Sequence, residues 1–314
     1  TSYSGTIGAD YERIDREAFT PTSAVSGVSA LRLETEEIGY RIELRRRMTE
    51  TFSGAVSFLT SERDGSNWLR PNSGLGVTEV ADPATGFAGT AVFSPTLADR
   101  RRERARLAAT WQPTDALSVQ LSGEAGRDKY STPTDYAVRK TRTNFYSVDL
   151  NYALTDAWSV NGFAARGTHK LDQARPAGSI IDYDNTSTNV GLGVNGKIGE
   201  RFDLGGGLSY LYDKSEYAQG LDPNAPPASA ALLAASGGLP DIVFKVTEAR
   251  VFGRYVLTRR SSVRLDAIHQ RARFNDWTYE YAGVPFTYSD NTTLSLKPVQ
   301  NVTFVGLTYT YMWQ

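Results

Sequence analysis

Apolar and polar residues alternate with a period of two along most of this sequence. In residues 116–125, the apolar side chains of Leu117, Val119 and Leu121 are separated by polar residues such as Gln120. A helix would scatter these apolar residues around its axis, because its period is 3.6 residues. The alternation therefore predicts β-strands, each with one apolar and one polar face.

Twelve segments show this alternation, and many of them run for ten to fifteen residues. A strand in a globular protein is usually ~5–6 residues long, whereas a strand that crosses a bilayer at a tilt needs ~9–11 residues. The lengths therefore favour membrane-crossing strands, although neither face of segment 158–170 is cleanly apolar. The segments are centred near residues 8, 40, 56, 106, 121, 148, 162, 192, 208, 252, 266 and 307.

Short and long connections alternate between these segments. Similar short turns recur at residues 46–54, 112–119, 153–160, 197–204 and 256–263. Long polar stretches occupy residues 15–30, 62–98, 129–140, 170–184, 213–242 and 276–298. Outer-membrane barrels have short periplasmic turns and longer extracellular loops. The pattern therefore predicts that the short turns and both termini are periplasmic.

We expect an all-β fold, namely an antiparallel transmembrane β-barrel of about twelve strands in the bacterial outer membrane. Residues 1–314 are interpreted as one barrel domain, either a barrel of its own or the C-terminal half of a larger barrel. The mean hydropathy of −0.38 agrees with this, because barrel strands average their two faces. A secreted β-sandwich also has alternating strands, but strand length and loop asymmetry disfavour it. The sequence leaves open whether twelve strands close on themselves.

Aromatic residues gather at the predicted strand ends. Interfaces between membrane and water attract aromatic side chains, so these residues are candidates for two girdles. The candidates near the short turns and the C-terminus are Phe52, Trp111, Trp158, Phe202, Tyr255 and Trp313. The candidates near the opposite strand ends are Tyr130, Tyr146, Tyr210, Tyr212 and Trp277.

Charged residues occupy the polar face of several predicted strands. In a barrel they face the lumen, because a charge on the lipid face near the midplane costs ~2–4 kcal/mol. They form either a charged conduit wall or a set of arginine–glutamate ladders that fill and stiffen the lumen. The candidates are Arg41, Glu43, Arg45, Arg104, Arg106, Glu248, Arg250 and Arg254, together with Arg47.

Composition limits the possible chemistry. The chain has no cysteine, which excludes disulfides, thiolate metal sites and covalent haem attachment through a C-x-x-C-H motif. The net charge of −1 gives no broad attraction to nucleic acid. We therefore expect no metal and no cofactor bound by this chain, and no nucleic-acid partner.

Three further features of the sequence resemble sites only weakly. His169 and His269 are the only histidines, and no serine nucleophile with recognisable spacing accompanies either. The "DYDN" stretch at 182–185 offers oxygen ligands for Ca²⁺, but an Asx-rich turn is favoured because the glycine and closing glutamate of a calcium loop are missing. The glycines at 205–207 are interpreted as relieving crowding within a strand.

One long polar stretch contains a predicted helix. Residues 224–240 combine prolines, an alanine- and leucine-rich run and a Gly-Gly pair, which fits a short capped helix. Such a helix would constrict the barrel mouth or bind a partner. Alternatively, it would only pack within its own long loop.

Several segments resemble the MtrB/PioB family of outer-membrane barrels. They are "GTIGADYERIDRE" (5–17), "RARFNDWTYEY" (271–281) and the aromatic last strand "NVTFVGLTYTYMWQ" (301–314), in which Gln314 follows Trp313. Members of that family sheathe a periplasmic multihaem c-type cytochrome and let electrons leave the cell. The resemblance thus implies outer-membrane lipids and such a cytochrome as partners, with the haem carried by the partner.

The chain departs from the family in two respects. Family members are about twice as long, with roughly twice as many strands, and often carry an N-terminal cysteine pair. A closed barrel of twelve strands would have a backbone diameter of ~24 Å, too narrow for a multihaem cytochrome, whereas twice the strands would give ~50 Å. The resemblance therefore implies either half of a sheath or a reduced relative.

Three functional hypotheses follow. The first is a porin-like sheath for a multihaem cytochrome in extracellular electron transfer, with arginines such as Arg41, Arg45, Arg104, Arg250 and Arg254 touching the partner. The second is a narrow diffusion channel for small polar solutes, whose selectivity these charges set. The third is a barrel enzyme, which is disfavoured because no catalytic constellation is readable.

Overall fold

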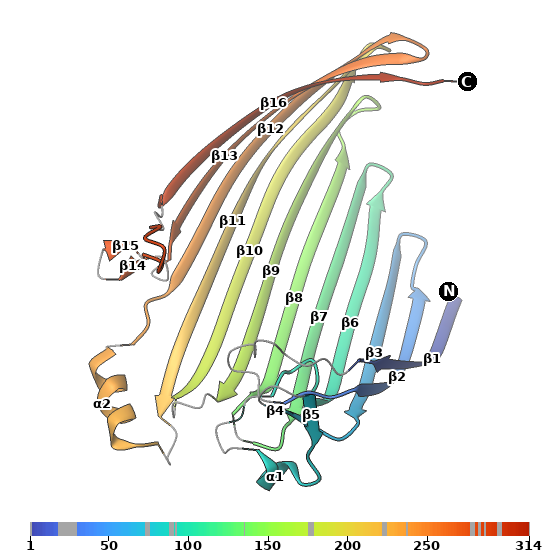
Figure 1. Cartoon of the computed structure of the whole chain (residues 1–314). Coiled ribbons are helices and arrows are strands. Elements are labelled where there is room, and N and C mark those ends of the chain that lie inside the picture. Colours follow the sequence, from blue (N-terminus) through green and yellow to red (C-terminus); the bar gives the residue numbers. More distant parts are fainter. Residues whose placement is uncertain are drawn as a thin grey trace.

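The computed structural model contains one large antiparallel sheet of twelve strands (Figure 1). It describes all residues except 1, 18–29, 73–75, 88–90, 92, 135, 175–178, 222–224, 237, 277–279, 282–283, 286, 294–296 and 314. The strands of the large sheet are β1 (Ser2–Asp15), β2 (Glu34–Arg47), β3 (Phe52–Gly65), β6 (Asp99–Thr114), β7 (Leu117–Ser131), β8 (Val138–Ala153), β9 (Trp158–Ala174), β10 (Ser179–Ile198), β11 (Phe202–Leu221), β12 (Ile242–Thr258), β13 (Ser261–Asn275) and β16 (Val299–Tyr311).

The twelve strands follow each other in chain order, and each pairs antiparallel with its predecessor and its successor. Each of the twelve alternating segments is a strand, which confirms that part of the prediction. The strands run from 13 residues in β16 to 20 in β10 and β11. These lengths exceed what a bilayer crossing at a tilt requires.

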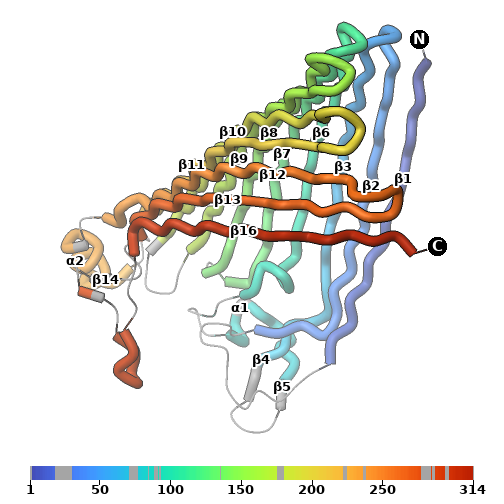
Figure 2. Tube along the Cα trace, turned by 90° about the horizontal axis from the view of Figure 1, so that it is seen from above, coloured from blue at the N-terminus to red at the C-terminus, as the bar shows by residue number. Residues whose placement is uncertain are grey.

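The large sheet is curved but not closed (Figures 1 and 2). Strands β1 and β16 stand at the two ends of the strand order, and among the described residues neither has a partner on its outer edge. A closed twelve-stranded barrel is therefore not what this chain forms by itself in the structure. Both edges therefore present backbone N–H and C=O groups in the arrangement that strands use for pairing.

The five predicted short turns lie at one end of the sheet, where both termini also lie (Figure 1). The hydroxyl of Thr155 accepts hydrogen bonds from the amides of Ala157 and Trp158, at 3.2 and 3.1 Å. Thr49 and Thr258 each accept one from an amide two residues later. Threonine recurs in these turns because its hydroxyl satisfies amides that the bend leaves without strand partners.

The opposite end of the sheet carries the small elements. They are the hairpin of β4 (Leu69–Asn72) and β5 (Gly76–Glu79), helix α1 (Pro83–Gly86), helix α2 (Pro227–Ser236) and the hairpin of β14 (Glu280–Tyr281) and β15 (Val284–Pro285). The helix expected within 224–240 is thereby confirmed as α2. Neither helix has the length and apolar character that a bilayer crossing would need.

Two of the long polar stretches are much shorter than predicted. Strands β7 and β8 extend so far that only residues 132–137 lie between them, and β9 and β10 leave only 175–178. The prediction of loops at 129–140 and 170–184 was wrong in extent because these strands continue with polar residues on both faces. Alternation stops marking a strand where neither face is apolar.

The "DYDN" stretch also belongs to this extension. Residues 182–185 lie inside β10, so the interpretation as an Asx-rich turn is wrong. Asp182 and Asp184 lie on one face, whereas Asn185 lies on the other and donates a hydrogen bond to Asp213 at 2.8 Å. A strand separates these oxygen ligands by placing them on opposite faces.

A compact apolar cluster forms over the strand ends, mainly from residues 66–98, with Ala30 and Ala137 as additional members. Phe93 is almost fully buried, at 1% exposure, and its ring meets Trp68 and Phe87 edge-on at 4.7 and 5.1 Å. The guanidinium of Arg32 stacks over Trp68 at 4.0 Å and pairs with Asp99. We call this group the loop core; its members are Ala30, Trp68, Val80, Phe87, Ala91, Phe93, Leu97 and Ala137.

Candidate functional site: two faces of one sheet

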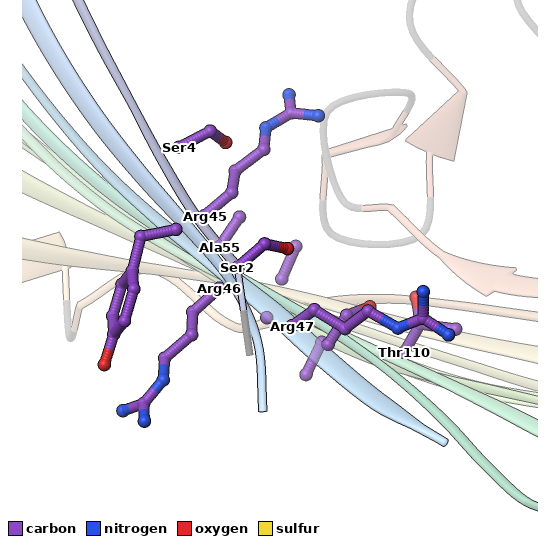
Figure 3. A pocket seen from close by; sticks show the side chains of 12 residues that line it. Ser2, Ser4, Arg45, Arg46, Arg47, Ala55 and Thr110 are labelled. Atoms are coloured by element: carbon purple, nitrogen blue, oxygen red, sulfur yellow. The ribbon is translucent and has the colours of Figure 1, made fainter. Parts of the chain in front are cut away.

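Cross-strand pairing divides the strand residues into two faces. Residues that pair directly across neighbouring strands lie on the same face, and successive residues lie on opposite faces. Figure 3 shows this in β2, where Arg45 and Arg46 point to opposite sides of the sheet. Arg45, Arg47, Ser2 and Ser4 line a cavity of about 550 Å³ near the short turns.

One face, the apolar face, is covered with aliphatic side chains in the half of the sheet next to the short turns. A soluble protein rarely leaves so large an apolar surface in water. These side chains are 38–74% exposed and therefore available for lipid. They include Ile42, Leu44, Val56, Leu107, Leu121, Val148, Leu150, Val190, Leu192, Leu208, Val251, Leu265, Val305 and Leu307.

The apolar face becomes charged farther from the turns. In β8 the outward residues run from Tyr152 to Tyr146 and then change to Asn144, Arg142 and Lys140. Most other strands of the sheet change similarly, after about four outward positions. Four such positions span about 20–25 Å along a strand, close to the ~25 Å height of the apolar band of membrane barrels.

All eight predicted lumen-facing charged residues lie on the other face, the polar face. The register aligns Arg41 with Leu59 and Arg104, and Glu43 with Ser57 and Arg106. Arg45 follows in the same alternation of β2. Val251 of β12 belongs to the apolar face, and Glu248, Arg250 and Arg254 alternate with it and point to the polar face.

Most of these arginines have an acidic neighbour. Arg104 and Arg106 both reach Glu124, at 3.2 and 2.7 Å. Arg250 pairs with Glu248 at 3.4 Å, Arg254 with Asp203 at 3.4 Å, and Arg45 with Glu43. The polar face is thus a set of charge ladders, which both stiffens the wall and presents charges of both signs.

Sequence reasoning missed the strongest of these ladders. Arg102 donates two hydrogen bonds to Asp128, at 3.0 and 2.9 Å, and the Asp128 side chain is only 4% exposed. Beside it, Glu37 accepts hydrogen bonds from Ser61 and Arg100. Arg102 continues the alternation of Arg104 and Arg106, which was the available signal.

A groove on the polar face runs over β10 and β11, and Gly193 and Gly207 are part of its lining. Other glycines of these strands, beside the groove, lie against aromatic rings. A Cβ atom on Gly191 would come within 2.4 Å of the Phe163 ring, and one on Gly205 within 2.3 Å of the Phe252 ring. The interpretation that glycine relieves crowding here is therefore confirmed at Gly205. The groove has a volume of about 490 Å³, and its lining includes Asn161, Asn195, Ser209, Glu248, Arg250 and Asp266.

The histidines do not meet. His169 is in β9 on the polar face, near the ring of Tyr183, and His269 is in β13 on the apolar face, where its Nδ1 lies 2.9 Å from the hydroxyl of Thr303. Among the described residues, no group of three or more histidine, aspartate and glutamate side chains has metal-binding geometry. The polar face thus offers charged and hydrogen-bonding side chains to whatever lies against it.

The aromatic residues predicted for the girdle near the short turns share the apolar face. Phe52 pairs directly with Trp111, and Phe202 with Tyr255, while Trp158 pairs with Gly196 beside Val194. Trp313 is 87% exposed just after β16. Tyr146, Tyr210 and Tyr212 lie on the apolar face of β8 and β11.

Tyr130 does not fit a girdle. It pairs with Arg100, on the polar face, so its assignment to the far girdle was wrong. The register of β7 decides this, because each one-residue step moves a side chain to the other face. Trp277 lies outside the described residues.

Known proteins agree with this architecture. The alcaligin outer membrane receptor FauA from Bordetella pertussis superposes with a TM-score of 0.57 and 13% identity, over 90% of this chain and 40% of FauA. The ferric preacinetobactin receptor BauA from Acinetobacter baumannii gives 0.56 and 11%, over 94% and 45%. The copper transporter OprC gives 0.56 and 10%, over 99% and 43%. This chain thus spans less than half the length of these proteins.

Fold and faces together define a membrane-spanning β-sheet protein of the bacterial outer membrane. Residues 1–313 match the model of the family described as "Putative outer membrane beta-barrel porin, MtrB/PioB". The chain therefore belongs to this family. No curated protein sequence matches it.

Proposed function

We propose that this chain forms part of the wall of a wide outer-membrane conduit that sheathes a multihaem cytochrome during extracellular electron transfer. The chain itself binds no haem in this proposal; the partner carries it. Membership of the MtrB/PioB family supports the proposal, and the open curved sheet is the observation that carries it.

The free edges of β1 and β16 argue for a wider wall than twelve strands. An unpaired backbone group costs several kcal/mol in the hydrocarbon region, so membrane sheets are closed. In this proposal, further strands therefore pair with β1 and β16, from the same polypeptide or from another. The superposition on 40–45% of larger outer-membrane proteins fits a section of a wide barrel.

The polar face suits a protein partner that is itself charged. Its ladders expose basic and acidic groups in alternation, such as Arg250 with Glu248 and Arg254 with Asp203. Charges of both signs on a wall give orientation and specificity to a docked partner more than they give affinity. An insulating wall also needs no redox group, and the polar face has no cysteine.

Co-purification tests the sheath. We expect an affinity-tagged chain, extracted from its native membrane, to bring down a protein that stains for haem peroxidase activity. Replacing Arg41, Arg250 and Arg254 together with glutamine should reduce the yield of that protein relative to the tagged chain. The matched control replaces Arg46, Arg166 and Arg271 on the opposite face and should leave the yield unchanged. Absence of any haem protein from the native extract would contradict the sheath.

A diffusion channel for small polar solutes is the second candidate, favoured by the groove of about 490 Å³ on the polar face. It predicts ion conductance in planar bilayers by the purified protein without a haem partner. It also predicts that replacing Glu248 with glutamine shifts ion selectivity toward anions, because a negative charge in a pore wall favours cations. Absence of ion conductance through planar bilayers that contain the purified protein would exclude this function.

A further inference from the structure

A group of cations lies on the apolar face where that face becomes charged. Arg127 in β7 pairs directly with Arg142 in β8, and Lys129 pairs directly with Lys140. We call these four residues the basic cluster. Like charges opposite each other in a sheet are destabilising, so a direct pairing of two cations twice in succession calls for a compensating anion.

The two cross-strand pairs of the basic cluster form two rows across the sheet, and the neighbouring strands β6 and β9 extend each row with a further cation. Arg101 of β6 stands opposite Lys129, and Lys170 of β9 stands opposite Arg142. These two flanking cations have acidic partners: Arg101 lies 3.7 Å from Glu103, and Lys170 pairs with Asp184. Their charges are therefore largely balanced within the protein.

The basic cluster itself is not balanced. Within the described part of the chain, none of its four cations makes an ion pair, although Glu103 stands opposite Arg127 and Asp172 opposite Lys140. Three of the four side chains are exposed, and Lys140 is half-buried. Lys140 and Arg142 also line a depression of about 520 Å³, but its lining includes the carboxylates of Asp172, Asp182, Asp184 and Glu216 as well. The depression is therefore not the anion site; the exposed surface over the four cations is.

The position of the basic cluster relative to the membrane is set by its own strands. In β7 the apolar residues Val119, Leu121 and Ala125 precede Arg127 on the same face. The cluster thus begins one outward position beyond the apolar band, on the side of the long connections. In an outer-membrane sheet that side is extracellular, and residues at this height meet the headgroups of the outer leaflet.

We propose that the basic cluster binds the phosphate groups of lipopolysaccharide in the outer leaflet. Charge complementarity selects this occupant, because four unpaired cations meet a lipid whose headgroup bears phosphates at the same depth. Neighbouring strands are ~4.8 Å apart and outward residues along a strand ~6.6 Å apart, so the four cations converge on an area the size of one or two phosphates. Arginine and lysine both bind phosphate, and arginine does so through two parallel hydrogen bonds.

Binding of a labelled lipopolysaccharide to the full chain in detergent micelles tests this proposal. The test variant replaces the basic cluster with glutamine: Arg127→Gln, Lys129→Gln, Lys140→Gln and Arg142→Gln. We expect its affinity to fall by about tenfold or more, and the salt dependence of binding to flatten, because each cation near an anionic lipid surface contributes separately. Heat-modified migration on gels verifies that the variant folds.

The matched control removes four cations at the other end of the sheet. It carries Arg47→Gln, Lys197→Gln, Arg201→Gln and Arg259→Gln, which lie in or next to the short turns. We expect it to bind lipopolysaccharide as the unmodified chain does. Equal loss in both variants would show a general charge effect and would overturn the site.

Two further measurements identify the ligand. Dephosphorylated lipopolysaccharide should bind no better to the unmodified chain than to the test variant, and tight binding of it would overturn the assignment to phosphate. Millimolar inorganic phosphate should not displace the lipid, and full displacement would instead assign a site for free phosphate. Neither measurement depends on haem or conductance, so the result stands apart from the proposed conduit.

Discussion

Arg102 and Asp128 form a two-pronged ion pair across β6 and β7, with hydrogen bonds of 3.0 and 2.9 Å. Arg104 adds a third cationic contact to the same carboxylate at 3.6 Å. The pair lies on the polar face beneath the connections that carry the loop core, and the Asp128 side chain is 4% exposed. It therefore ties the strand ends to each other away from water.

Removal of this carboxylate is expected to be costly. Asp128→Ala should lower the free energy of unfolding by roughly 2–4 kcal/mol, because two arginines lose a shielded partner. Urea unfolding in detergent, followed by tryptophan fluorescence, measures the change. The control Asp203→Asn removes a partner of Arg254 whose side chain is 27% exposed, and it should cost at most about 1 kcal/mol. Equal effects at both positions would contradict the importance we give to burial.

The assignment of the two faces is tested in β10. Leu192→Arg places a charge in the apolar band and should cost roughly 2–4 kcal/mol or prevent insertion into vesicles. Asn189→Arg places the same charge on the polar face of the same strand and should be tolerated. The fraction of protein that resists proteolysis after folding into lipid vesicles measures both. A reversed order of the two variants would mean that the faces are assigned wrongly.

The close approach of the Phe252 ring to the backbone of β11 is tested at Gly205. Gly205→Ala should destabilise the protein by roughly 1–3 kcal/mol, because the added Cβ meets Phe252, whose ring is held by Arg264 at 4.0 Å. Gly5→Ala is the matched control, since its nearest neighbour is 4.0 Å away. Comparison of the two unfolding midpoints gives the result, and an unchanged midpoint for Gly205→Ala would show that the Phe252 ring moves aside at little cost.

The loop core should behave as a local folding unit. Phe93→Ala removes a large side chain that is only 1% exposed. It should lower the free energy of unfolding of the loop core by roughly 3–5 kcal/mol. We expect limited proteolysis to cut faster within residues 66–98 while the sheet stays protected. Leu232→Ala in α2, where the side chain is 73% exposed, should change nothing. Simultaneous cleavage throughout the sheet would show that the loop core and the sheet unfold together.

The sequence determined all twelve strands, the five short turns and helix α2. It did so because each depends on local chemistry: an alternating face, a threonine hydroxyl at a turn, or a helix-forming run between prolines and glycines. The same alternation placed all eight predicted charges, from Arg41 to Arg254, on one face. An alternation with a period of two can be read from neighbouring residues alone, without knowing which distant strand pairs with them.

Only the tertiary structure decided where alternation ends. Residues 182–185 continue β10, although their composition is that of a turn, because β9 and β11 supply hydrogen bonds on both sides. Register decided that Tyr130 joins the polar face, and packing against Trp68 and Phe87 placed Phe93 inside the loop core. The tertiary structure alone likewise decided that the sheet stays open, since among the described residues β1 and β16 have no partner on their outer edges. Such pairings are set by long-range contacts, which local residue patterns do not encode.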